Sequence, residues 1–163
     1  MIGKTHALAG ACAALALNAT GVGVVLATFG AVLPDIDCAT SIVGKHAKTL
    51  ATILPHRGPT HSLLFLFLSL CINPWLALGV LTHIVLDMIN PRGLLLFWPF
   101  KTKVKFPLGK AAPTGGKFEL ILQIILIAIS VYFCTKSLNG LYIYTMIDIA
   151  KTKFSKIMSL LNL

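Results

Sequence analysis

Histidine and aspartate residues recur in this sequence at spacings that suit the binding of a metal ion. His83 and Asp87 are four residues apart, so on a helix both side chains would project from one face and could bind one ion. Asp35 and Asp37 are two positions apart, which suits a turn in which one carboxylate binds and the other orients or bridges. We predict seven metal ligands in all: His6, Asp35, Asp37, His56, His61, His83 and Asp87.

Arg57 lies between two of the predicted histidine ligands, in a segment that could bind phosphate. A Gly-Pro turn separates His56 from His61, and Thr60 is expected to cap the helix that follows. The N-terminus of that helix would attract an anion, and the guanidinium beside it could bind phosphate through two hydrogen bonds. We therefore expect Arg57 to stabilise negative charge on phosphoryl oxygens.

The predicted ligands are nitrogen and oxygen donors without a thiolate, which suits zinc, with manganese or iron as alternatives. Seven donors exceed the four of a tetrahedral site, so one or two ions are expected. Two ions would lower the pKa of bound water to about 7 and hold both oxygens of a phosphoester. Asp35 or Asp87 would act as general base if the metal does not fully engage it, beside Arg57. The alternative for each residue alone is an ordinary polar contact, such as a hydrogen bond between helices.

Apolar helices must position these residues. Breaks at 18–21 and 73–74 divide the first 90 residues into two pairs of apolar blocks, 7–17 with 21–33 and 63–72 with 75–88. If each pair forms a helical hairpin, the predicted ligands emerge at one membrane face. The blocks have 10 to 14 residues, fewer than the roughly 20 that cross a bilayer. How deeply these helices insert stays open.

The C-terminal third contains the most apolar stretch. Residues 120–133 form the best candidate for a full span, and residues 141–163 combine lysines with apolar side chains, as interfacial helices do. We predict an all-α, polytopic membrane protein with two short helical hairpins, one longer transmembrane helix and an interfacial C-terminal helix. Residues 1–136 would form the membrane-embedded domain with a basic loop at 91–117, and residues 137–163 a basic amphipathic segment.

Composition supports a membrane location. The chain of 163 residues is 56% hydrophobic with a formal net charge of +9, which is unlike an ordinary soluble domain. Its basic residues concentrate in the loops 38–60 and 91–117, which favours contact with anionic lipid headgroups and places this face in the cytoplasm. No nucleic-acid-binding motif accompanies the charge, so no direct nucleic-acid partner is expected.

The order of these motifs resembles the YdjM family of inner-membrane proteins. The resemblance implies a multi-pass protein of a bacterial or archaeal cytoplasmic membrane that is a metal-dependent hydrolase using the seven predicted ligands. Members are also described as LexA-binding. A distant similarity to zinc-dependent phospholipase C favours a phospholipid or other phosphoester as substrate. The matching residues span roughly 1–110 and are Thr5-His6 with Gly10, Pro34 to Asp37, His56 to Ser62, His83 with Asp87, and Asn90-Pro91 with Trp98-Pro99.

Three functions fit these observations. The first is a membrane-embedded metallohydrolase that acts on a phosphoester at the cytoplasmic face. The second is a divalent-metal transporter or sensor, but its polar residues should line both halves of the helices, whereas here they crowd one end. The third is a non-enzymatic regulatory membrane partner of a DNA-damage repressor, which would not explain seven donors. The sequence leaves the oligomeric state open.

Overall fold

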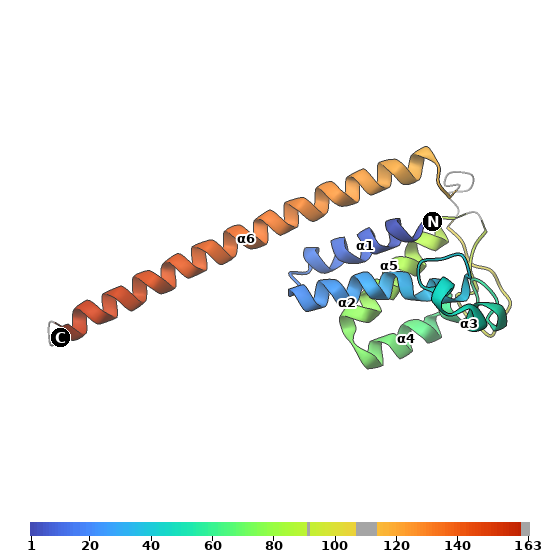
Figure 1. The fold of residues 1–163 in the computed structure, drawn as a ribbon, viewed down its shortest axis with the longest axis horizontal. Coiled ribbons are helices and arrows are strands. Elements are labelled where there is room, and N and C mark those ends of the chain that lie inside the picture. The colour runs from blue at the N-terminus through green and yellow to red at the C-terminus, as the bar shows by residue number, and fades with distance from the viewer. Residues whose placement is uncertain (91, 107–113, 161–163) are drawn as a thin grey trace.

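The chain folds into helices, and the predicted all-α class is confirmed. The computed structural model describes residues 1–90, 92–106 and 114–160, with side chains placed as far as Lys153, so part of the predicted basic loop lies outside it (Figure 1). Among the described residues the regular elements are the α-helices and short 3₁₀ helices α1 (Gly3–Ala16), α2 (Gly21–Val32), η1 (Leu33–Asp37), η2 (Gly44–His46), α3 (Lys48–Ile53), η3 (Pro59–His61), α4 (Leu63–Ile72), α5 (Pro74–Met88) and α6 (Lys117–Leu160).

Polar side chains define where α4 and α5 begin. Ser62 caps α4, because its hydroxyl accepts a hydrogen bond from the backbone N–H of Phe65 at 3.3 Å. Asn73 caps α5 through its side-chain oxygen, and Pro74 follows at the first helical position, where the missing N–H is not needed. The expected cap by Thr60 is wrong, because η3 places this residue two positions too early and its hydroxyl turns to a carboxylate instead.

Glycines allow α1, α2 and α5 to pack backbone against backbone. A Cβ atom added at Gly79 of α5 would overlap the carbonyl oxygen of Ala27 in α2, and one at Gly30 would overlap the carbonyl oxygen of Leu76. Gly10 of α1 approaches the backbone of α2 in the same way. Close approach through small residues is how helices associate where the hydrophobic effect contributes little.

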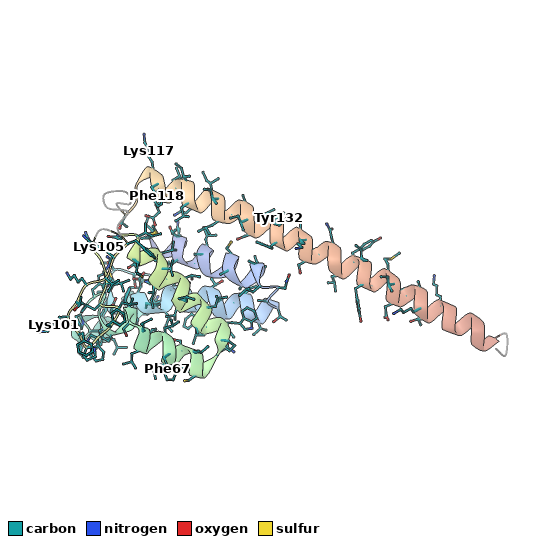
Figure 2. All side chains as sticks on the ribbon, turned by 180° about the vertical axis from the view of Figure 1, so that it is seen from behind. Phe67, Lys101, Lys105, Lys117, Phe118 and Tyr132 are labelled. Carbon is teal, nitrogen blue, oxygen red and sulfur yellow. The ribbon has the colours of Figure 1, made fainter. Side chains whose placement is uncertain are left out.

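The ends of these helices that carry the predicted ligands gather at one end of the bundle. There α1 and α4 begin and α2 and α5 end, beside the loops and the short helix α3 (Figure 1). Lys101, Lys105 and Lys117 lie at this same end (Figure 2). The helix ends therefore meet as the sequence predicted, at a face rich in basic side chains.

A single helix, α6, stands where two C-terminal elements were predicted. The prediction of a separate interfacial helix is wrong, because Lys117–Leu160 is continuous over 44 residues. Gly140 lies in its middle and costs about 1 kcal/mol relative to alanine, but no proline interrupts the helix. A helix of this length extends roughly 66 Å, about twice the hydrocarbon thickness of a bilayer.

The described part of the chain contains one helix that is long and apolar enough to cross a membrane, Lys117–Lys153. The first part of α6 runs beside α1, and the remainder projects beyond the bundle (Figure 1). Almost all of the apolar window is exposed in the monomer. The helices α1, α2, α4 and α5 have 10 to 15 residues each, so none of them reaches the length of a full span.

A buried carboxylate joins α6 to the start of α1. Glu119 is 2% exposed and accepts hydrogen bonds from the hydroxyl of Thr5 at 2.6 Å and from the backbone N–H groups of Ile2 and Gly115. Gln123 donates to the same Thr5 hydroxyl at 2.8 Å. Because Thr5 precedes a predicted ligand, this network ties the membrane-length helix to the end of the bundle where the ligands meet.

Replacing Glu119 with alanine is expected to lower the free energy of unfolding by about 3 kcal/mol, because the buried Thr5 hydroxyl and two partly buried backbone N–H groups would lose their acceptor. Thermal unfolding of the detergent-purified protein measures the loss. Asp148→Ala is the matched control, since Asp148 is the other acidic residue of α6 and is exposed. Equal stability of the two variants would contradict the proposed link.

Candidate metal centre

The predicted ligands form three overlapping groups whose donor atoms lie within 4.8 Å of one another. Neighbouring groups share a residue: His83 belongs to the first two and Asp35 to the last two. All seven predicted ligands are therefore in one continuous cluster. In order, its three groups are His6, His83 and Asp87, then Asp35, His61 and His83, then Asp35, Asp37 and His56.

Hydrogen bonds on Nδ1 leave Nε2 of His61 and His83 free to bind an ion. His83 Nδ1 lies 2.6 Å from the carbonyl oxygen of Ala31, which can only accept, so this nitrogen carries the proton. His61 Nδ1 lies 3.0 Å from the Thr60 hydroxyl, whose own proton is donated to Asp37, and 3.2 Å from a carboxylate oxygen of Asp37. Both neighbours therefore act as acceptors, so this nitrogen also carries a proton. A second partner that fixes the tautomer in this way is typical of histidines that bind metals.

The two free Nε2 atoms face each other at 3.0 Å, and both rings are fully buried. Two bare nitrogen lone pairs at this distance repel unless a cation lies between them. Two nitrogens bound to one tetrahedral zinc ion are roughly 3.3 Å apart, which is close to the observed separation. Asp35 Oδ1 lies 3.9 Å from Nε2 of His61 and 3.8 Å from Nε2 of His83. The donor set therefore fits a metal ion.

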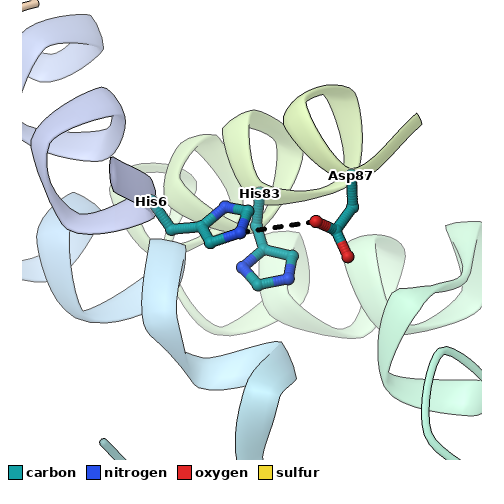
Figure 3. A group of neighbouring side chains, drawn as sticks. All are labelled: His6, His83 and Asp87. Atoms are coloured by element: carbon teal, nitrogen blue, oxygen red, sulfur yellow. Dashed lines mark ion pairs between the residues drawn. The ribbon is translucent and has the colours of Figure 1, made fainter. Parts of the chain in front are cut away.

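His6 and Asp87 extend the cluster toward α1. The His6 ring stacks on His83 with centroids 3.8 Å apart, and its Nε2 lies 3.4 Å from Asp87 Oδ1 (Figure 3). Among the described residues, His6 Nδ1 has no hydrogen-bond partner although it is buried. A buried nitrogen without a partner is costly, so packing alone does not explain a histidine at this position.

Asp37 organises the loop side of the cluster. One of its oxygens accepts from His56 Nδ1 at 2.7 Å, and the other accepts from the Thr60 hydroxyl at 2.7 Å and the Arg57 backbone N–H at 3.0 Å. His61 Nδ1 is the fourth donor. Burial alone would raise the pKa of Asp37, but these hydrogen bonds outweigh it and hold the pKa below its ordinary value.

Asp35 and His56 face the opening of the cluster and differ in environment. Burial raises the pKa of the Asp35 carboxyl, although nearby histidines oppose the effect. The hydrogen bond to Asp37 raises the pKa of His56, whose side chain is 42% exposed. Asp35 is therefore the carboxyl of this region that takes up a proton most readily.

Arg57 adopts an unusual backbone conformation to reach the cluster. Its φ of 64° lies in the left-handed region, which costs a residue with a side chain on the order of 1 kcal/mol. Its Nη2 lies 3.1 Å from Asp87 Oδ2, and its Nη1 donates to the carbonyl oxygen of Gly93 at 3.4 Å. Backbone strain at a charged residue beside the predicted ligands indicates a functional position.

The cluster opens into a pocket of about 350 Å³. Asp35 and Asp87 lie on its wall together with the cations Arg57 and Arg92, and Cys38 and Ser41 lie nearby. A small substrate could therefore reach the predicted ligands from outside the bundle.

The comparisons with known proteins agree with the motif resemblance. The family model of the YdjM inner membrane protein matches residues 1–153. The chain belongs to the YdjM family. The inner membrane protein YdjM of Escherichia coli (strain K12) is 32% identical over 119 residues, as is that of Shigella flexneri. This alignment covers 61% of the chain and 60% of each relative, so the chain spans about three fifths of their length.

A relative in Bacillus subtilis (strain 168), the protein YvsG, is 31% identical over 153 residues, which is 82% of this chain and 94% of that protein. No solved structure matches the chain. The recognition of the YdjM family from the motifs is thereby confirmed, and so is its membership among inner membrane proteins.

The structure of this YdjM-family chain brings all seven predicted ligands together, and their binding of metal stays a prediction. Two residues at the site were not anticipated. Glu119 supports the start of α1, and its signal in the sequence is an acidic residue at the start of the most apolar helix. Ser41 accepts from the Gly44 N–H and donates to the Asp35 carbonyl oxygen at 2.6 Å, and no motif marks it.

Replacing Asp37 with asparagine is expected to weaken metal binding by about 10- to 100-fold, as loss of a partner behind metal-binding histidines usually does. The amide keeps the size of the carboxylate but cannot accept from four donors. Competition with a fluorescent zinc chelator measures the affinity, and Asp148→Asn controls for loss of charge. Unchanged affinity would show that Asp37 does not orient His56 and His61.

Proposed function

We propose that this protein is a membrane-embedded metal-dependent hydrolase that cleaves a phosphoester, with a phospholipid as the preferred substrate, at the cytoplasmic face. The observation that supports this best is the pair of Nε2 atoms on His61 and His83, which face each other at 3.0 Å beside two carboxylates. Structural zinc sites of soluble domains commonly use thiolates. A cluster of histidine and carboxylate donors that opens into a pocket suits hydrolysis instead.

Three residues would hold the first ion, Asp35, His61 and His83, which leaves one position of a tetrahedral site for water. His6, stacked against His83, would join Asp87 at a second ion. Zinc is our first choice, with manganese or iron as alternatives, because the donors are imidazole and carboxylate. When bound, the metal would supply Lewis acidity to water and to a phosphoryl oxygen.

The chain's own residues would perform the remaining steps. Asp35 faces the pocket, and its second carboxylate oxygen, which the metal would not use, would accept the proton of the attacking water. Arg57 would donate hydrogen bonds to the phosphoryl oxygens and stabilise the charge that develops on them. Asp37 would orient His56 and His61 through the hydrogen bonds that already occupy both of its oxygens. This favours a positioning role for Asp37 over the direct ligand role predicted from the sequence.

In the proposed multi-pass arrangement, α6 crosses the bilayer and the shorter helices α1, α2, α4 and α5 insert beside its first half. The cluster would then lie at the membrane surface, where basic side chains such as Lys101 and Lys105 can contact anionic headgroups (Figure 2). The cluster occupies one end of the bundle, which disfavours the alternative of a metal transporter, since transport requires a path through the helices. A regulatory role as partner of a DNA-damage repressor would not require the converging donors.

A hydrolysis assay tests the proposal. Purified protein in mixed micelles, supplied with zinc or manganese, is incubated with p-nitrophenyl phosphate, its phosphodiester analogue and a fluorescent phospholipid. We expect turnover that a chelator abolishes and that Asp35→Asn lowers by about 100-fold or more, as losses of general bases typically do. His46→Ala is the control, because His46 is exposed in η2 and outside the cluster. Turnover that is equal in Asp35→Asn and wild type would overturn the mechanism.

A further inference from the structure

A second hollow of about 370 Å³ adjoins the metal centre. The two cavities share a wall made by His56, Arg57 and Arg92. The second hollow is also lined by Lys103 and by the segment Gly93 to Leu95. Its lining therefore contains three permanent cations and no acidic side chain, whereas the first cavity contains Asp35 and Asp87.

Arg57 faces both cavities with one guanidinium. Its Nη2 pairs with Asp87 on the side of the metal centre, and its Nη1 donates to the Gly93 carbonyl oxygen on the side of the second hollow. Its Nε is buried and has no hydrogen-bond partner among the described residues. A guanidinium has five donors, so Arg57 retains donors that could bind anions on either side.

Loop geometry holds the second hollow in place. Leu94 and Val104 form an antiparallel bridge with backbone hydrogen bonds of 2.9 and 3.0 Å, which places Lys103 opposite Leu95, and both of these residues line the hollow. The Leu95 N–H donates to the Arg57 carbonyl oxygen at 3.1 Å, so the loop is attached directly to the strained arginine. The basic hollow is thus part of the same framework as the cluster.

We propose that this hollow is a phosphate subsite, and that the substrate carries two directly linked phosphates, one at the metal centre and one between Arg57, Arg92 and Lys103. This inference rests on the proposed function and narrows its substrate class to a diphosphate ester. The reason is distance: one guanidinium borders both cavities, so anionic groups bound on its two sides must be neighbours, as the two phosphates of a diphosphate are. A single phosphate at the metal centre would leave the second hollow without a ligand.

Phosphate binding to metal-free protein tests the subsite by itself. Isothermal titration with inorganic phosphate is carried out on wild type, on the double variant Arg92→Gln/Lys103→Gln, and on Lys101→Gln/Lys105→Gln. The second pair lies in the same loop, removes the same charge and does not line the hollow. We expect a loss of about tenfold or more in the first pair and a change of less than about twofold in the control. No loss in the first pair, or an equal loss in both, would overturn the subsite.

Metal-loaded protein tests the diphosphate. Wild type should bind methylenediphosphonate at least about tenfold more tightly than methylphosphonate, and Arg92→Gln/Lys103→Gln should abolish this preference. Because diphosphonates chelate metals, retention of the ion is measured by mass spectrometry after each titration. Equal affinity for the two phosphonates in wild type would overturn the diphosphate assignment.

The affinity for a prenyl diphosphate dispersed in detergent shows whether the diphosphate ligand is a lipid or a soluble molecule. Tighter binding than methylenediphosphonate assigns the diphosphate to a lipid, and equal binding assigns it to a soluble molecule; either result supports the subsite. Failure of the proposed function would give a different result, because the protein would then bind no metal and hydrolyse no substrate. The phosphate titration of metal-free protein would still show whether the second hollow binds phosphate.

Discussion

Replacing His61 or His83 with alanine is expected to remove the bound metal. Wild-type protein purified in detergent should contain about one to two equivalents of a transition metal, as mononuclear and two-metal hydrolytic sites do. Both histidines are fully buried and direct Nε2 at the same point, 3.0 Å apart. Losing either leaves the shared ion with one nitrogen donor fewer and a void in its place. Inductively coupled plasma mass spectrometry measures the metal content.

Two controls separate loss of the ion from loss of the fold. His46→Ala removes an exposed histidine outside the cluster and should retain the wild-type metal content. His61→Gln keeps most of the side-chain volume, so the protein should fold yet still lose metal. Absence of metal from wild type after reconstitution with zinc and manganese, or its full retention in His61→Gln, would contradict the metal centre.

Replacing Gly79 with alanine is expected to lower the free energy of unfolding by about 3 kcal/mol, at the upper end of what overpacking usually costs. The added methyl would overlap the carbonyl oxygen of Ala27 and lie 2.6 Å from the backbone nitrogen of Ala31. These atoms belong to a helix backbone and cannot rotate away, so α2 and α5 must separate. Denaturant titration of the protein in detergent measures the loss.

The same substitution should also weaken metal binding. Gly79 lies four residues before His83 on α5, and the carbonyl oxygen of Ala31 is the partner that fixes the His83 tautomer. Moving α2 away therefore releases the imidazole. We expect metal affinity to fall together with stability, measured by competition with a fluorescent chelator.

Gly140→Ala is the matched control for Gly79→Ala. Both are glycine-to-alanine changes inside a helix, but nothing lies within 4 Å of a Cβ added at Gly140. Alanine is the better helix former, so Gly140→Ala should raise stability by up to about 1 kcal/mol and leave metal binding unchanged. If Gly79→Ala proved equally harmless, the close packing of α2 and α5 could not be what positions His83.

Local patterns in the sequence were sufficient to predict the all-α class and the boundaries of the short apolar helices. The breaks near Asn18 and Asn73 divide the apolar blocks where the structure ends one helix and begins the next. Once those blocks are helices, chain direction alone brings the predicted ligands to one end. The error at α6 also has a local cause: the lysines among apolar side chains in 141–163 suggested a separate interfacial element, although lysine does not stop a helix whose backbone hydrogen bonds can continue.

What the sequence by itself determined is therefore the helical class, the family and the set of seven candidate ligands, because periodicity, composition and motif order are properties of neighbouring residues. The tertiary structure decided what each side chain does within that set. It places four donors around Asp37, sets the free nitrogens of His61 and His83 against each other, and pairs Glu119 with Thr5 across 114 positions of chain. These roles depend on distances of a few ångströms between elements far apart in the sequence, and only the packing of helices on one another sets such distances.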